Sequence, residues 1–287
     1  MNSLRGRDAP APYKTMIIDV HSHDFPDQIA VRAMNGMCRR TDGKLWASGD
    51  ATLTNHLEQM DRFGIDKSVI CPIATRPGMF DGILREAVRI RDGERGEKAR
   101  ERIIPFASVH PLDPHAMDQL DRIAAAGLKG VKFHCFFQEF SLADKEVWPI
   151  FGKIADLGLV AQCHCGADVG WDFIGLCGPR EIATLLKNVR GLKFIAAHLG
   201  GCDGYPPHAT DQVLECGAYI DTSILHRRWH YDESMRILRS WPTDRILFGT
   251  DFPWTHYPEA ISWVKSVRDP KDWDALFGEN ACRLLSI

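Results

Sequence analysis

Histidines recur in this sequence where short apolar runs end. Six of the twelve histidines occupy such positions, and Asp251 follows a further run of the same kind. These histidines are His21, His23, His110, His134, His164 and His198. Neutral imidazoles combined with a carboxylate suit Zn²⁺ or a similar divalent ion and leave room for a water ligand. If the apolar runs are strands whose ends meet, the pattern predicts a metal site.

The first pair of these residues is His21 and His23. Residues two apart on a strand project to the same side, so both imidazoles can reach one ion. The spacing alone is a weak signal, because two polar residues leaving a strand give the same pattern. Asp19 has the same phase as the pair. It is expected either to fix the tautomer of a ligand histidine or to accept backbone hydrogen bonds at the strand end.

Short apolar runs alternate with longer amphipathic stretches along the chain. We predict eight strands, at Met16–Val20, Ser68–Pro72, Ile103–Val109, Gly130–Phe133, Leu159–Cys163, Lys193–Ala197, Ala218–Asp221 and Arg245–Gly249. We predict helices between and after them, at residues 52–63, 82–91, 114–126, 145–157, 179–188, 209–216, 233–240 and 258–267, with a closing helix at 273–284. Five glycines follow these helices by a residue or two, as C-terminal glycines do.

This alternation determines the fold class that we expect. Repeated strand–helix units with continuous apolar strands favour a parallel sheet covered by helices, and eight of them favour an α/β fold of the (β/α)₈ TIM-barrel type. The absence of GxGxxG after the first strand argues against a nucleotide-binding sheet. Residues 1–14 are expected to be a loose arm before a single domain at 15–287. The long loop Asp24–Asp50 should border the site, because active sites of barrels lie at the carboxyl ends of the strands.

Composition excludes several classes of partner. The chain has 35 basic and 38 acidic residues, a net charge of −3 and no basic stripe, so no nucleic-acid partner is expected. No apolar run approaches the roughly 20 residues that span a bilayer, and no secretory signal is visible. Nine scattered cysteines favour reduced thiols and a cytoplasmic location. The expected partner is a small-molecule substrate, and a homo-oligomer is left open.

Several motifs together resemble a known family. IIDVHSH, GLKGVKFH, VAQCHCG, FIAAHLGG, YIDTS, ILFGTDFPW and GENACRLL occur in this order. The chain resembles the amidohydrolase superfamily, in particular the amidohydrolase-related branch that contains the aminocarboxymuconate-semialdehyde decarboxylase-like enzymes. The resemblance covers nearly the whole chain after residue 15 and is specific as a set, although each motif is weak alone.

The resemblance implies a role for each residue of the metal site. It makes His21, His23, His164 and Asp251 the ligands of one divalent ion, most simply Zn²⁺, with Mn²⁺ or another divalent ion as alternatives. It makes His198 the catalytic acid/base and gives Asp251 a second role as a base.

Binuclear relatives hold their second ion through a carbamylated lysine or a glutamate after the fourth strand. Here that region contains Lys132 and His134. We place both outside the metal shell and leave a second ion open.

Residues near the predicted rim are weaker candidates for binding a substrate. Arg76, or else Arg227 or Arg228, could pair with a substrate carboxylate, although exposed loop arginines give the same pattern. The remaining candidates for the pocket wall are His134, Phe136 and Trp254.

The function expected from these observations is metal-dependent hydrolysis. A bound ion would lower the pKa of its water toward 7 and so activate it against a lactone, amide or ester in a small polar, carboxylated substrate. The first alternative is nonoxidative decarboxylation of an unsaturated or aromatic acid at the same metal site. The second is a non-catalytic metal-binding barrel.

Overall fold

Eight parallel strands form the centre of the protein in the computed structural model, which describes residues 16–223 and 231–287 apart from 42 and 45. They are β1 (Ile18–Ser22), β2 (Lys67–Ile70), β3 (Ile103–Pro105), β4 (Gly130–His134), β5 (Val160–His164), β6 (Lys193–Ala196), β7 (Tyr219–Asp221) and β8 (Ile246–Leu247). All eight predicted strands are present. The third is shorter than predicted, because its ladder to β2 stops at Pro105.

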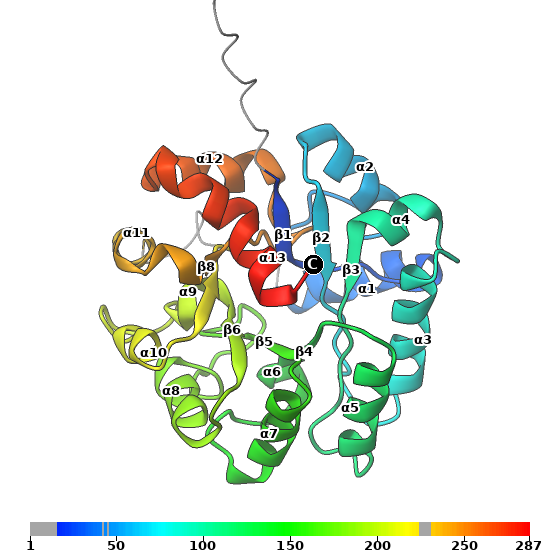
Figure 1. The fold of residues 1–287 in the computed structure, drawn as a ribbon, viewed down its shortest axis with the longest axis horizontal. Coiled ribbons are helices and arrows are strands. Elements are labelled where there is room, and N and C mark those ends of the chain that lie inside the picture. The colour runs from blue at the N-terminus through cyan, green and yellow to red at the C-terminus, as the bar shows by residue number, and fades with distance from the viewer. Residues whose placement is uncertain (1–15, 42, 45, 224–230) are drawn as a thin grey trace, which may run out of the picture.

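The strands form two sheets that together make the predicted TIM barrel (Figure 1). β1–β3 form one sheet and β4–β8 the other, each in sequential order. At the two seams, the isolated parallel bridges Ser22↔Phe252 and Ala107↔Val131 replace continuous ladders. The barrel is therefore α/β with parallel strands, and its hydrogen-bonded ladder is interrupted twice.

Helices surround the strands. They are α1 (Asp27–Arg40), α2 (Leu53–Phe63), α3 (Phe80–Arg91), α4 (Glu97–Arg102), α5 (Ala116–Ala125), α6 (Cys135–Gln138), α7 (Trp148–Asp156), α8 (Pro179–Asn188), α9 (Ala197–Gly201), α10 (Asp211–Glu215), α11 (Tyr231–Ser240), α12 (Tyr257–Val267) and α13 (Asn280–Leu285). The start and end of α2 show how the sequence sets its limits. Thr52 accepts a hydrogen bond from the Asn55 N–H, and Gly64 ends the helix with φ 71°.

The segment 24–50 differs from the long loop that the sequence suggested. It borders the site as expected, but most of it forms helix α1. Met34 is buried in a small cluster with Trp254 and Ala51. The helix therefore has an apolar face that the glycines and charges of the segment obscured.

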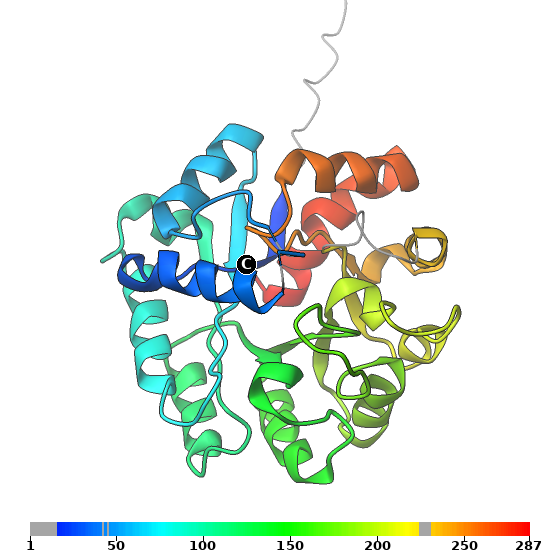
Figure 2. The ribbon, with the colours of Figure 1, turned by 180° about the vertical axis from the view of Figure 1, so that it is seen from behind.

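The two ends of the barrel are covered differently. A cluster of buried strand side chains continues into Ala281, Leu284 and Leu285 of α13, which lies across one end (Figure 1). Seen from behind, α1 lies across the opposite end, where the site is located (Figure 2). Among the described residues, no helix is long and apolar enough to cross a membrane.

Candidate active site

The two histidines of the HxH pair are oriented by acceptors on neighbouring strands. His23 Nδ1 lies 2.8 Å from the carbonyl oxygen of Cys71, which can only accept, so this nitrogen carries the proton. His21 Nδ1 lies 2.9 Å from Asp221 Oδ2 and donates to that carboxylate. In the neutral form of each imidazole, the lone pair is therefore on Nε2, the nitrogen that a metal ion would use.

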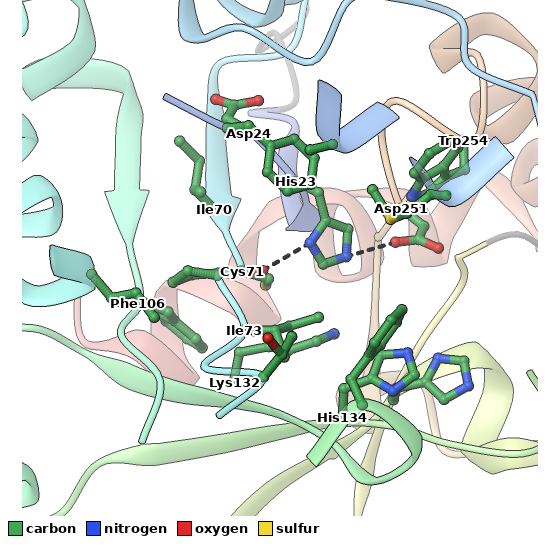
Figure 3. Close-up of a pocket in the computed structure, with 18 of the residues that line it drawn as sticks. His23, Asp24, Ile70, Cys71, Ile73, Phe106, Lys132, His134, Asp251 and Trp254 are labelled. Atoms are coloured by element: carbon green, nitrogen blue, oxygen red, sulfur yellow. Dashed lines mark hydrogen bonds and ion pairs between the residues drawn. The ribbon is translucent and has the colours of Figure 1, made fainter. Parts of the chain in front are cut away.

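Both Nε2 atoms point at the same carboxylate oxygen. Asp251 Oδ1 lies 3.0 Å from His23 Nε2 and 3.3 Å from His21 Nε2, and Figure 3 shows the contact with His23. The lone pairs of two imidazoles repel a carboxylate oxygen that faces them, unless a proton or a metal cation lies between these groups. Two imidazole nitrogens and one carboxylate are a donor set that fits a divalent ion such as Zn²⁺.

Lys132 reaches this site from β4. It is fully buried, and its Nζ lies 2.6 Å from His21 Nε2. Lys132 therefore donates to the lone pair that a metal ion would also use. The strand lysine that the sequence placed outside the metal shell thus contacts a predicted ligand directly.

A chain of hydrogen bonds fixes His198. Ser223 Oγ donates to Asp221 Oδ1 at 2.5 Å and lies 2.8 Å from His198 Nδ1, from which it accepts. Asp221 Oδ1 also accepts the backbone N–H of His198 at 3.0 Å. With the proton on Nδ1, His198 presents a lone pair on Nε2, 3.0 Å from His164 Nδ1.

The possible ligand atoms fall into two groups. One contains His21, His198 and Asp251, and the other contains His134, His164 and Asp168. The rings of His134 and His164 stack with centroids 4.1 Å apart and an interplanar angle of 10°. Parallel rings cannot both point their nitrogens in-plane at one ion, so the second group is a poor metal site. His164 belongs to the second group, but its Nδ1 lies 3.0 Å from His198 Nε2 of the first, and its role as fourth ligand stays a prediction.

Burial and charge set the protonation of the site. Burial lowers the pKa of His198 to about 3, although nearby Asp251 opposes this shift. For Asp251, burial favours the neutral acid, yet the neighbouring His21 and the hydrogen bond with His23 outweigh it and lower the pKa. The site therefore contains a neutral imidazole beside an ionised carboxylate, an arrangement that suits cation binding.

Asp19 is not the residue that orients a ligand histidine. Its carboxylate accepts the backbone N–H groups of His21 and Thr250 and the Thr250 hydroxyl. The second of the two expectations for Asp19 is thus the observed one, and Asp221 fixes the tautomer of His21 instead.

Both proposed proton-transfer residues have unusual backbone conformations. His198 has φ 57° and Asp251 has φ 59°, in the left-handed region that residues other than glycine rarely adopt. The Asp251 N–H donates to the carbonyl of His21 at 2.7 Å. Such conformations persist only where surrounding structure holds them, and they concentrate at functional sites.

One cavity of about 1170 Å³ is lined by the site histidines together with Lys132, Asp168 and Asp251. Of the residues predicted to bind substrate, Arg76, His134 and Trp254 line it. Phe136 is buried behind the wall against Trp171, whereas its neighbour Phe137 lines the cavity. Arg227 and Arg228 lie outside the described residues.

Four residues of the site were not predicted from the sequence. Asp221 is the last residue of β7 and Ser223 follows it, so the rule that selected Asp251 at the end of a strand would have selected Asp221 also. Arg40 and Trp171 carry no such signal. The Arg40 guanidinium lies 4.4 Å from the centre of the Trp171 ring, and only the fold brings α1 and the loop after β5 together.

Comparisons with known proteins agree with this architecture. The amidohydrolase family model matches residues 18–287. A search of curated proteins finds no match. Among solved structures, an uncharacterized TIM-barrel protein from Bordetella bronchiseptica has a TM-score of 0.74 and 18% identity, covering 94% of this chain and 98% of its own.

Two further solved structures carry activities in their names. A probable 2-pyrone-4,6-dicarboxylic acid hydrolase from Acinetobacter baumannii, with citric acid bound, has a TM-score of 0.67 and 15% identity, covering 94% of this chain and 99% of its own. The 5-carboxyvanillate decarboxylase from Novosphingobium aromaticivorans, with manganese and a nitrobenzoic acid, has a TM-score of 0.66 and 15% identity, covering 95% of this chain and 96% of its own.

Fold and site together define a TIM-barrel enzyme with a divalent metal site at the carboxyl ends of its strands. The chain belongs to the amidohydrolase family.

Proposed function

We propose that this protein is a hydrolase that uses one divalent ion, most simply Zn²⁺, to cleave a lactone, amide or ester in a carboxylated molecule. The fixed tautomer of His198 carries this proposal. Because Nδ1 donates to Ser223, Nε2 is the nitrogen of His198 that can accept a proton within the cavity, where it lies 3.0 Å from His164 Nδ1. A neutral imidazole positioned in this way is a general base.

The other residues have complementary roles. His21, His23 and Asp251 would hold the ion, with His164 as the predicted fourth ligand. When bound, the ion supplies Lewis-acid activation of water and of a carbonyl group. Arg40, held against Trp171, offers paired N–H donors to a substrate carboxylate.

Nonoxidative decarboxylation is the second candidate. Two observations favour it: the fold is shared with a decarboxylase of an aromatic acid, and Arg40 provides an anchor for a carboxylate. The same ion and the same His198 would serve either reaction. Arg40 at the cavity wall could orient the substrate carboxylate in either reaction.

Isotope incorporation on the best substrate from a screen of lactones, amides, esters and carboxylates distinguishes the two reactions. Hydrolysis in H₂¹⁸O places ¹⁸O at the attacked carbonyl, whereas decarboxylation in D₂O releases CO₂ and places deuterium on carbon. We expect ¹⁸O incorporation. Carbon-bound deuterium with no ¹⁸O would contradict hydrolysis and establish the second candidate. His198→Ala should lower turnover by roughly 10² to 10⁴-fold while the metal content stays unchanged.

A further inference from the structure

The cavity is larger than a small polar acid requires. Its volume of about 1170 Å³ exceeds the roughly 300–1,000 Å³ of ordinary ligand pockets. From the metal-binding side chains, it continues outward beneath α1 toward α3. Figure 2 shows α1 running from the centre of the barrel to the side where α3 lies.

Two helices line this outer part with matching faces. α1 contributes Ile29, Arg32, Ala33, Gly36, Met37 and Arg40. α3 and the residue before it contribute Met79, Gly82, Ile83, Glu86, Ala87 and Ile90. In both helices the spacing is i, i+3, i+4, i+7, i+8 and i+11, which is one continuous face. The two helices therefore border the space along their length.

Small side chains keep this space open. A methyl group added at Gly36 or Gly82 would meet no atom within 4 Å. Glycine inside a helix costs about 1 kcal/mol relative to alanine, so helix stability does not explain either glycine. Ala33 and Ala87 are also small. We call the space between α1 and α3, with Gly36 and Gly82 on its walls, the side chamber.

The side chamber is apolar where it joins the site and charged at its rim. Ile70, Ile73 and Phe106 line the junction, and Figure 3 shows Ile70 and Phe106 on the side of the pocket away from His134. At the rim, Arg95 forms ion pairs with Glu86 at 2.8 Å and with Asp27 at 3.6 Å, which joins α3 to α1.

We propose that the side chamber binds the alkyl or aryl substituent of an organic acid whose reacting end lies at the metal centre. This inference rests on the proposed function and names its substrate class. The substrate is a carboxylated molecule with a large hydrophobic group, rather than the small polar molecule that the sequence suggested. Burial of that group supplies binding energy in proportion to its apolar area.

A chain-length series tests the proposal by binding alone. Calorimetry on the zinc-loaded protein compares 4-methyl-, 4-butyl- and 4-octylbenzoate with the corresponding 4-alkylphenols, which lack the carboxylate. We expect affinity to rise by about fourfold for each buried methylene. Gly82→Leu should abolish this gain and leave 4-methylbenzoate binding unchanged. Gly152→Leu is the matched control, because Gly152 also meets no atom within 4 Å but lies in α7, away from the cavity.

The possible outcomes distinguish failure of the side-chamber proposal from failure of the proposed function. If 4-methylbenzoate binds and longer chains bind no better, the side chamber is contradicted while the carboxylate site stands. If the phenols bind more tightly as their alkyl chains lengthen and no benzoate binds, the side chamber is supported and a carboxylate-directed function is contradicted. If affinity still rose with chain length in Gly82→Leu, the substituent would bind elsewhere and the proposal would be overturned.

Discussion

Each site histidine has one ring nitrogen fixed by a partner, and this determines what the other nitrogen can do. His23 is held by a carbonyl and His21 by a carboxylate, so both direct Nε2 at Asp251. His198 is held by a hydroxyl, which leaves its Nε2 as an acceptor. The same residue type is thus divided between metal binding and proton transfer by its hydrogen-bond partners.

This division predicts the metal content of two variants. The wild-type protein should bind about one divalent ion per chain, measured by elemental analysis after dialysis. His23→Ala and Asp251→Asn should each weaken binding by more than the roughly 10–100-fold that loss of an outer hydrogen-bond partner causes. His115→Ala is the control, because His115 is exposed and outside the cavity. Full metal retention in both site variants would show that the ligand assignment is wrong.

At the scale of elements, an ion-pair cluster joins α10 to α11. Arg236 Nη2 lies 2.7 Å from Glu233 Oε1 and 2.8 Å from Asp211 Oδ1. The hydrogen bond from Arg236 lowers the pKa of Glu233 below its ordinary value of 4.5, and Arg236 also helps to lower the pKa of Asp211 against the effect of burial. The cluster connects two short helices that share few other polar contacts in the described residues.

The lowered pKa values predict how stability depends on pH. A carboxylate with a depressed folded-state pKa stabilises the fold above its ordinary pKa, and this contribution is lost as pH falls through the lowered value. Arg236→Met should therefore reduce the free energy of unfolding by up to about 1 kcal/mol at pH 7, since Asp211 is half exposed, and by less at pH 3. Urea unfolding at both pH values measures this. Lys271→Met is the control and should show no such pH dependence, because its ion pair is long and exposed. If Arg236→Met lowered the free energy of unfolding equally at both pH values, the electrostatic cause would be ruled out.

At the scale of the whole molecule, the barrel depends on close packing where its two sheets meet. Gly130 begins β4 beside the β3–β4 seam, and a methyl group there would lie 2.4 Å from the ring of Phe106. Phe106 is fully buried in the cluster that continues into α13. A larger residue at 130 would force the seam or the ring to move.

Gly130→Ala should therefore destabilise the protein by about 1–3 kcal/mol, the usual cost of overpacking a core. The double variant Gly130→Ala/Phe106→Leu should be less destabilised than the sum of its single changes, because leucine removes the atoms that clash. Urea unfolding of the wild type, the two single variants and the double variant gives the coupling free energy between positions 130 and 106. Gly152→Ala, in open space within α7, should instead be neutral or slightly stabilising. Strict additivity at 130 and 106 would show that the ring does not oppose the methyl group.

The sequence by itself determined the alternation of eight strands with helices and the location of the histidines at strand ends. These features follow from local periodicity, and the structure confirms them except for His110, which lies five residues beyond the end of β3 and outside the cavity lining. The helix α1 was missed because glycines and charges interrupt its apolar face.

Only the tertiary structure decided which side chains meet at the site. His21 and Asp221 are 200 residues apart in sequence, and Arg40 meets Trp171 only because α1 folds back over the barrel end. The tautomers of the histidines and the side chamber depend on such contacts between distant elements. A periodic pattern gives the face on which a residue lies, but the packing of the complete barrel sets its partner and its distance.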